Sequence, residues 1–269
     1  MFRFKNWRKE EPRRVYAVGD IHGRLDLFQR LIAIIKRDHA SRVPVPTRII
    51  LPGDLIDRGP DSATLVRWCR QLTDGTDRFV VLKGNHEAMM VAAIRDADFE
   101  VMEVWLQQGG GEALASWGVP RPLIAQGASV ELLHAARGAV DSDTLKWMAA
   151  LPLTARHEDH LFVHAGIRPG VPLKRQQELD LLWIRNDFLD SKEDHGCVVV
   201  HGHSVHESGP DVRRNRIGID SGAYRTGRLT AIGLEDGQFW PLMTERAKVD
   251  PSGKQARSAS DPFVDRKAS

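Results

Sequence analysis

Gly84-Asn85-His86-Glu87 is the third of three polar loops that each follow a short apolar run in this chain of 269 residues. The earlier two are Gly19-Asp20-Ile21-His22-Gly23 and Gly53-Asp54-Leu55-Ile56-Asp57-Arg58-Gly59. Each loop is followed by apolar residues at helical spacing, so a unit of strand, loop and helix occurs three times. This repetition predicts parallel or mixed strand pairing with helices on the sheet faces, in an α/β or α+β architecture.

Apolar runs typical of buried strands return after residue 158. Two of them end in histidine-containing loops, His164-Ala165-Gly166 and His201-Gly202-His203. Between these loops, residues 179–189 have the spacing of a helix and contain Arg185. The strands predicted in this half are 161–163, 197–200 and 216–220, with a hairpin formed by 228–234 and 238–242.

One catalytic domain is expected over residues 14–244, because the motifs continue along the chain without a linker. Residues 1–13 are basic and contain no apolar run of signal-peptide length, so they predict a flexible arm. Residues 245–269 are mostly polar and predict a disordered tail. Residues 91–158 have helical periodicity and no metal-ligand cluster, which indicates a helical insertion that either forms part of a substrate wall or only covers a sheet face.

The overall charge gives no reason to expect a nucleic-acid or membrane partner, because 38 basic residues face 36 acidic ones. No apolar stretch reaches the roughly 18 residues of a membrane span. The two cysteines, Cys69 and Cys197, cannot form a disulfide framework and are expected to be buried thiols. These features predict a cytoplasmic protein, and none of them indicates an oligomeric state.

The polar loops are expected to meet, since ligands of open α/β sheets bind beyond the carboxyl ends of the strands. Carboxylate, imidazole and amide oxygen are the ligands that hard and borderline divalent metals take. Asp54 is placed to bridge two ions, with the other ligands on either side. The six predicted metal ligands are Asp20, His22, Asp54, Asn85, His164 and His203.

Such a centre supports phosphate-ester hydrolysis, because a water held between two ions loses a proton near neutral pH and needs no Ser or Cys nucleophile. His86 is the predicted general acid for the leaving oxygen, and Asp57 is predicted to orient its imidazolium. Arg58 and Arg185 can bind phosphate oxygens in the bidentate manner of a guanidinium, and Lys83 can add a point charge.

Five sequence blocks resemble those of the calcineurin-like metallophosphoesterases, and within them the serine/threonine phosphoprotein phosphatases of bacterial and phage type. The blocks are the three loops above, Val163-His164-Ala165-Gly166 and Gly202-His203, within a resemblance that covers about residues 15–242. The resemblance implies a two-sheet β-sandwich flanked by helices, two metals (most often manganese, alternatively iron or zinc) and direct attack by a metal-bridging hydroxide. It also implies the residue roles given above and selects His203 rather than His201.

The expected substrates are phosphoproteins or phosphorylated small molecules, with phosphoserine, phosphothreonine and phosphotyrosine all open. Lys83 stands where the family's phosphatases often carry Arg. Asp220-Ser221-Gly222-Ala223-Tyr224 replaces the Ser-Ala-Pro-Asn-Tyr-like signature of the eukaryotic enzymes, and Tyr224 either touches substrate or packs at a strand end. The same blocks occur in symmetrical dinucleoside tetraphosphate hydrolases, which is the alternative function. A catalytically silent metal-binding regulatory module is the third.

Overall fold

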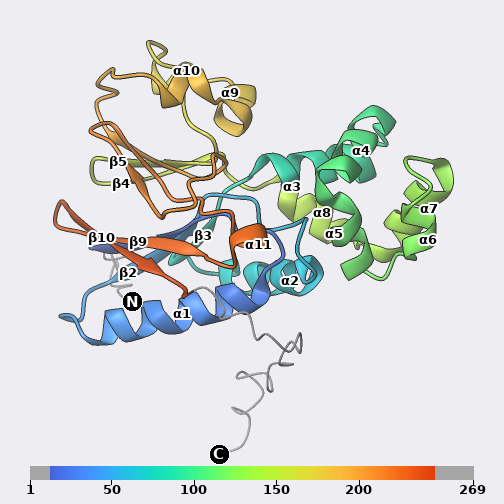
Figure 1. The fold of residues 1–269 in the computed structure, drawn as a ribbon, viewed down its shortest axis with the longest axis horizontal. Helices are drawn as coiled ribbons and strands as arrows, with labels where there is room; N and C mark the ends of the chain where they lie inside the picture. Colours follow the sequence, from blue (N-terminus) through green and yellow to red (C-terminus); the bar gives the residue numbers. More distant parts are fainter. Residues whose placement is uncertain (1–12, 246–269) are drawn as a thin grey trace, which may run out of the picture.

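The computed structural model describes residues 13–245, so residues 1–12 of the predicted arm and 246–269 of the predicted tail lie outside the described residues. Two five-stranded mixed sheets pack together with helices on their outer faces (Figure 1). This is the two-sheet sandwich that the resemblance implied. No helix within residues 13–245 has both the length and the apolar character needed to cross a membrane.

The first sheet has the strand order β10-β9-β1-β2-β3. β1, β2 and β3 are parallel, and β9 and β10 form an antiparallel hairpin on the other side of β1. The sheet therefore confirms the strands predicted before the three polar loops and the hairpin predicted near the end of the chain. Its strands are β1 (Arg14–Val18), β2 (Thr47–Leu51), β3 (Phe79–Val81), β9 (Thr230–Glu235) and β10 (Gln238–Met243).

The second sheet has the order β4-β5-β6-β8-β7, with β5, β6 and β8 parallel and with β4 and β7 antiparallel at the edges. The sequence did not predict the two edge strands, and β4 lies inside the range assigned to the helical insertion. β4 alternates exposed and buried side chains and has no apolar run that would reveal it. The strands are β4 (Thr154–His157), β5 (His160–Val163), β6 (Val198–His201), β7 (Asp211–Val212) and β8 (Arg216–Gly218).

The inner faces of the two sheets share one apolar cluster, because successive side chains of a strand point to opposite faces. It unites residues from β1, β2, β9 and the residue after β3 with residues from β5, β6 and β8. Its buried members are Val15, Ala17, Ile50, Leu82, Phe162, Val200, Ile217, Ile219, Ile232 and Leu234. This interface fixes the carboxyl ends of the parallel strands of both sheets relative to one another.

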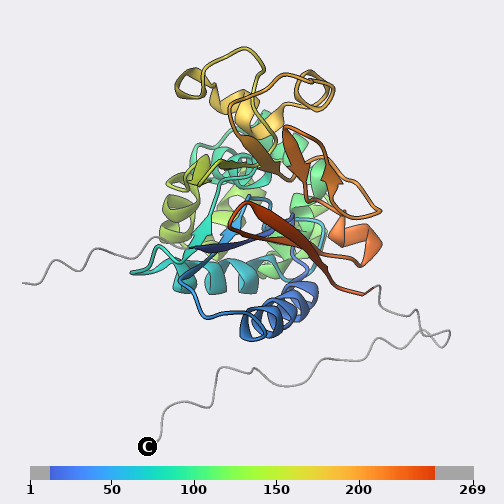
Figure 2. The same ribbon diagram turned by 90° about the vertical axis from the view of Figure 1, so that its left-hand side faces the viewer.

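Helices cover the outer faces of both sheets (Figures 1 and 2). The helix predicted over residues 179–189 is in fact two helices, because Ile184 and Arg185 have non-helical backbone angles. This break turns Arg185 out of a regular helix and into the short turn between the two. The helices are α1 (Leu25–Ala40) and α2 (Ser62–Thr73) on the first sheet, and α9 (Glu178–Trp183) and α10 (Asn186–Leu189) on the second.

The predicted insertion is helical up to residue 149 and gathers at one side of the sandwich, beside α3 (Asn85–Met90) (Figure 1). The glycine triplet at 109–111 marks a real break, where Gly109 has φ 105° inside a π-helix. The elements are η1 (Val91–Arg95), α4 (Phe99–Trp105), η2 (Leu106–Gly110), α5 (Gly111–Ser116), α6 (Arg121–Ile124), α7 (Val130–Ala139) and α8 (Ser142–Ala149).

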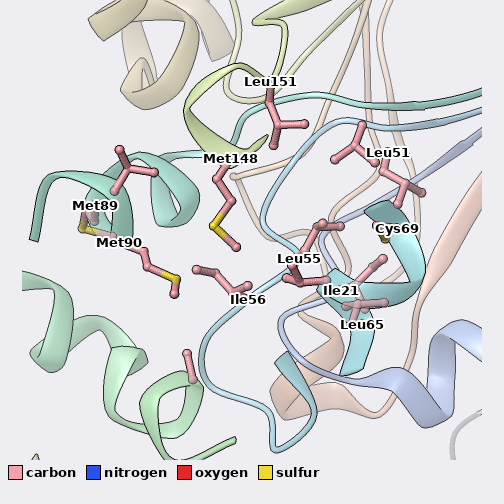
Figure 3. Packing of buried hydrophobic residues seen from close by; sticks show 14 of the residues in the cluster. Ile21, Leu51, Leu55, Ile56, Leu65, Cys69, Met89, Met90, Met148 and Leu151 are labelled. Atoms are coloured by element: carbon pink, nitrogen blue, oxygen red, sulfur yellow. The ribbon is translucent and has the colours of Figure 1, made fainter. Parts of the chain in front are cut away.

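Apolar residues inside the polar loops anchor those loops to the core. Ile21, Leu55 and Ile56 are fully buried and belong to the same cluster as Met89 and Met148 (Figure 3). Burying a side chain of this size contributes about 1.5–3 kcal/mol relative to leaving it exposed. The alternation of anchored apolar and free polar residues therefore holds each loop in one conformation.

Candidate metal centre

The candidate site residues adopt backbone conformations that are rare for residues with side chains. Eight non-glycine residues among those described have positive φ, and five of them are candidate site residues: His22, Asp54, Asp57, Arg58 and His203. Such a conformation costs on the order of 1 kcal/mol for each residue and persists only where the surrounding packing enforces it. Concentrated strain of this kind is typical of functional sites.

Glu87 ties two of the loops together. Its Oε2 accepts hydrogen bonds from the amides of Asp54 and Gly84, and its Oε1 accepts one from the amide of Leu55, each at 2.9 Å. Burial, followed by the nearby charge of Asp54, raises the pKa of Glu87 to about 7. The last residue of the Gly84-Asn85-His86-Glu87 block thus sets the backbone that carries Asp54.

Asp54 lies at the centre of the site and is surrounded by imidazoles. Its Oδ2 is 3.4 Å from Nε2 of His164, 3.6 Å from Nε2 of His22 and 3.9 Å from Nε2 of His86. Burial opposes the charge of this carboxylate, but the surrounding histidines outweigh burial and lower the pKa of Asp54. The carboxylate is therefore ionised and reachable by donors from both sheets.

Asn85 joins the histidines of the second sheet to this centre. Its Oδ1 is 2.7 Å from Nε2 of His164 and 3.2 Å from Nδ1 of His203. The amide of His203 donates to Oδ2 of Asp20 at 2.8 Å. Burial lowers the pKa of His164, and burial with the charge of its neighbours lowers the pKa of His203 to about 3. A lowered pKa favours the neutral imidazole, which is the form that binds metals.

These donors fit two divalent ions. Oδ1 of Asp20 and Nε2 of His203 are buried, and neither has a hydrogen-bond partner among the described residues. Unsatisfied buried polar atoms in a carboxylate and imidazole cluster are the pattern a bound metal explains. Asp54 belongs to both possible sites, as a bridging ligand would. The two groups, each with ligand atoms within 4.8 Å of one another, are His22, Asp54, His86 and Asp54, His164, His203.

His86 and Asp57 form a buried pair next to the metal donors. Nδ1 of His86 is hydrogen-bonded to Oδ2 of Asp57, and the same oxygen accepts the indole N–H of Trp105 at 2.7 Å. Burial opposes the charge of His86, but the carboxylates of Asp54 and Asp57 outweigh burial and raise its pKa. The pair turns Nε2 of His86, the ring nitrogen that accepts from Arg58, towards the metal donors.

Arg58 and Tyr224 also reach the centre. The guanidinium of Arg58 lies 2.6 Å from Nε2 of His22 and 3.0 Å from Nε2 of His86. Its carbon is 4.6 Å from the ring centroid of Tyr224, and the Tyr224 ring meets the His22 ring edge to face at 5.3 Å. Tyr224 belongs to the short helix α11 (Ala223–Thr226). The structure therefore brings these two candidate substrate contacts together.

The two remaining candidate substrate contacts differ in position. Arg185 is exposed in the turn between α9 and α10, and its charge contributes to the lowered pKa values of His164 and His203. The contact made by Lys83 is an ion pair with Glu178, 3.2 Å from Nζ to Oε1. Lys83 is thus held at the start of α9 and does not join the cluster around Asp54.

Asp220 is a site residue that sequence reasoning missed. It is 2 % exposed, its charge adds to burial in raising the pKa of Asp20, and its Oδ1 accepts the amide of Gly222. Burial raises the pKa of Asp220 to about 6. Its position at the carboxyl end of a predicted strand was the available signal, since the proposed metal ligands also lie at strand ends. Trp105 was missed as well, because a helical aromatic residue is indistinguishable in sequence from an ordinary core residue.

The model of the calcineurin-like phosphoesterase family matches residues 13–229. The chain is 29 % identical to Serine/threonine-protein phosphatase 1 of Salmonella typhimurium, over 86 % of this chain and 94 % of that protein. It is 32 % identical to the symmetrical bis(5'-nucleosyl)-tetraphosphatase of an Acidovorax strain, over 58 % of this chain and 44 % of that protein.

Among solved structures, a suspected diadenosine tetraphosphatase shares the fold, with a TM-score of 0.60 at 20 % identity over 89 % of this chain and 96 % of that one. The match of the family model spans all five sequence blocks, the whole second sheet and strands β1 to β3 of the first sheet. The family implies a dinuclear divalent metal site, and the histidine and aspartate groups around Asp54 have the donors for one. On this evidence the chain belongs to the calcineurin-like phosphoesterases and is a hydrolase.

Proposed function

We propose that this chain is a metal-dependent phosphatase that hydrolyses phosphomonoesters of phosphoproteins, at serine or threonine and with phosphotyrosine as a further candidate, and that manganese is its preferred metal. The proposal depends most on the similarity to Serine/threonine-protein phosphatase 1 of Salmonella typhimurium, which extends over 94 % of that protein. The buried acid pair of His86 and Asp57 supports it chemically.

The proposed metal ligands are the six predicted residues. Two bound divalent ions would supply a nucleophilic water and withdraw charge from the phosphoryl group. Asp54 would be shared by the two ions, since both donor groups contain it. The ligands are Asp20, His22, Asp54, Asn85, His164 and His203.

The proposed general acid is Nε2 of His86. Asp57 holds Nδ1 of the same ring, so the second nitrogen can carry the proton for the leaving oxygen. A serine or threonine alkoxide is a far poorer leaving group than a nucleotide and depends far more on such a proton. A buried, carboxylate-supported acid therefore favours phosphomonoesters of alcohols over dinucleoside polyphosphates.

The proposed phosphate contacts are Arg58 and Arg185, with Tyr224 beside Arg58. Arg58 already points at the imidazoles of His22 and His86, where the reacting phosphoryl group would lie. Its planar fork suits two phosphate oxygens at once. Lys83 is the weakest of the proposed contacts, because its ammonium group is engaged with Glu178.

Symmetrical hydrolysis of dinucleoside tetraphosphates is the second candidate function. The similarity to the bis(5'-nucleosyl)-tetraphosphatase of an Acidovorax strain supports it, although it spans only 44 % of that protein. The metal donors and the acid pair can act in either reaction, and the acid favours phosphomonoesters, so a preference for dinucleoside tetraphosphates would have to come from the surrounding pocket.

A substrate panel tests the two candidates. Purified protein would be stripped of metal, reloaded with Mn²⁺, Fe²⁺ or Zn²⁺, and assayed on phosphoserine, phosphothreonine and phosphotyrosine peptides and on diadenosine tetraphosphate. We expect the highest kcat/KM on a phosphopeptide with Mn²⁺. A strong preference for diadenosine tetraphosphate would overturn the proposal, and inactivity on p-nitrophenyl phosphate with any metal would favour a silent module.

The role of His86 is tested with His86→Asn and two leaving groups. General acids contribute about 10²- to 10⁴-fold, so we expect a loss of that order on phenyl phosphate and a much smaller one on 2,4-dinitrophenyl phosphate. His134→Asn is the matched control, because His134 is exposed on α7. Equal losses on both substrates would show that His86 is not the acid.

A further inference from the structure

The helical insertion reaches the acid pair through Trp105. Asp57 is fully buried, and its Oδ2 accepts hydrogen bonds from both His86 and the Trp105 indole. Its other oxygen, Oδ1, has no hydrogen-bond partner among residues 13–245. Among the described residues, the Asp57 carboxylate therefore accepts two hydrogen bonds, one from His86 and one from the Trp105 indole.

Trp105 itself cannot shift. Its side chain is fully buried, and a Cβ added to Gly110 would lie 2.5 Å from its ring. Real Cβ atoms essentially never come this close to another atom, so the indole is packed directly against the glycine backbone. This close packing on Gly110 places the Trp105 N–H on Asp57.

The break in the helix at Gly109 contacts Arg58. The amide of Arg58 donates to the carbonyl of Gly109 at 3.1 Å, and its Nε donates to the carbonyl of Gln108 at 3.3 Å. Gly109 has φ 105°, and a Cβ there would lie 2.7 Å from Cγ of Arg58. Single-turn π-helices are often found at functional sites. The only φ that fits this contact is one that glycine adopts readily.

We propose that residues 105–110 are a positioning segment for the active site. Trp105 fixes Asp57 and, through it, the imidazole of His86, while the carbonyls of Gln108 and Gly109 fix Arg58. The insertion is then part of the catalytic apparatus and more than a cover for the core. The inference rests on the proposed function, because it assigns these residues by their effect on the acid and on the phosphate contact.

Trp105→Phe removes the N–H and keeps an aromatic ring. We expect kcat on phenyl phosphate to fall about tenfold, as for the loss of one hydrogen bond to a charged group, and kcat on 2,4-dinitrophenyl phosphate to change less than about twofold. KM and Mn²⁺ affinity should be unchanged. Trp147→Phe, on α8 of the same insertion, is the matched control and should leave both rates unchanged.

Gly109→Ala tests the second contact and has a different signature. Displacing Arg58 weakens phosphate binding regardless of the leaving group, so KM should rise by a similar factor on both substrates while the leaving-group dependence stays that of the wild type. A variant that instead behaves like Trp105→Phe would contradict the separate roles assigned to Trp105 and Gly109.

Several outcomes would overturn the proposal. Trp105→Phe with wild-type rates, or with equal losses on both leaving groups, would reduce Trp105 to a packing residue. If Trp105→Phe fails to fold, replacing the indole by benzothienylalanine at position 105 removes the N–H while keeping the shape, and the same two rates decide. Failure of the proposed function is separate, since it would show in the substrate panel as a preference for diadenosine tetraphosphate while the leaving-group test of Trp105→Phe still applies.

Discussion

Gly202→Ala should weaken metal binding without unfolding the protein. Gly202 lies between His201 and His203, and its φ is not in the left-handed region, so alanine meets no backbone obstacle. A Cβ there would lie 1.9 Å from Oδ1 of Asp20, whereas real Cβ atoms essentially never approach closer than 3.0 Å. The carboxylate would have to retreat by roughly 1 Å, which is enough to spoil a metal ligand.

The expected size of the effect follows from the loss of one well-placed ligand. Disturbing the surroundings of a metal site typically costs about 10- to 100-fold in affinity, or roughly 1.4–2.7 kcal/mol. Calorimetric titration of metal-free protein with Mn²⁺ should show one weakened site and one little changed. Gly138→Ala is the control, since a Cβ at this position on α7 meets nothing within 4 Å. Wild-type dissociation constants for both sites in a folded Gly202→Ala would refute Asp20 as a ligand.

Three further predictions use other parts of the site. Asp54→Asn should impair both ions, and metal analysis showing two Mn²⁺ per chain at wild-type affinity would contradict the bridge. Arg58→Lys should raise KM for phenyl phosphate about tenfold because an ammonium cannot fork onto two oxygens, and an unchanged KM would argue against phosphate binding. Burial lowers the pKa of His201 from 6.5 to about 4, so His201 is protonated at a lower pH in the folded chain than in the unfolded chain. His201 should therefore lower the free energy of unfolding by roughly 3 kcal/mol between pH 6.5 and pH 4. In urea unfolding, His201→Asn should lose about 3 kcal/mol less than the wild type over this pH range, and an equal loss in both proteins would contradict the prediction.

The parallel strands and their loops were predictable because their signals are local. An apolar run followed by Gly-Asp or Gly-Asn-His-Glu predicts both the strand and the place where it ends. The placement of Asp54 amid the histidines then follows from the rule that parallel strands present their carboxyl ends together. The polar residues could be read from sequence because the apolar ones between them, such as Ile21, fix the loop in the core.

The parts of the fold and of the site that the sequence did not predict depend on contacts between residues far apart in the chain. β4 and β7 are short edge strands whose pairing is decided by their neighbours, and their own residues show no apolar run. Asp220 meets Asp20 only after β8 has joined the second sheet. The hydrogen bond from Trp105 to Asp57 depends on the close packing of the Trp105 ring on Gly110, which helical periodicity does not reveal. The sequence position of Lys83, next to Gly84, suggested a phosphate contact, but its ammonium group forms an ion pair with Glu178.

The division of the proposed ligands between the two sheets determines when the metal site can form during synthesis of the chain. Asp20, His22, Asp54 and Asn85 follow strands of the first sheet, whereas His164 and His203 follow β5 and β6 of the second. The hairpin that completes the first sheet, β9 and β10, follows all six proposed ligands along the chain. A nascent chain can therefore hold the full ligand set only once His203 has been made, and a finished first sheet only once β10 has been made. The proposed metal site can therefore form only after His203 has been synthesised, and a chain truncated before that residue would lack the full set of proposed ligands.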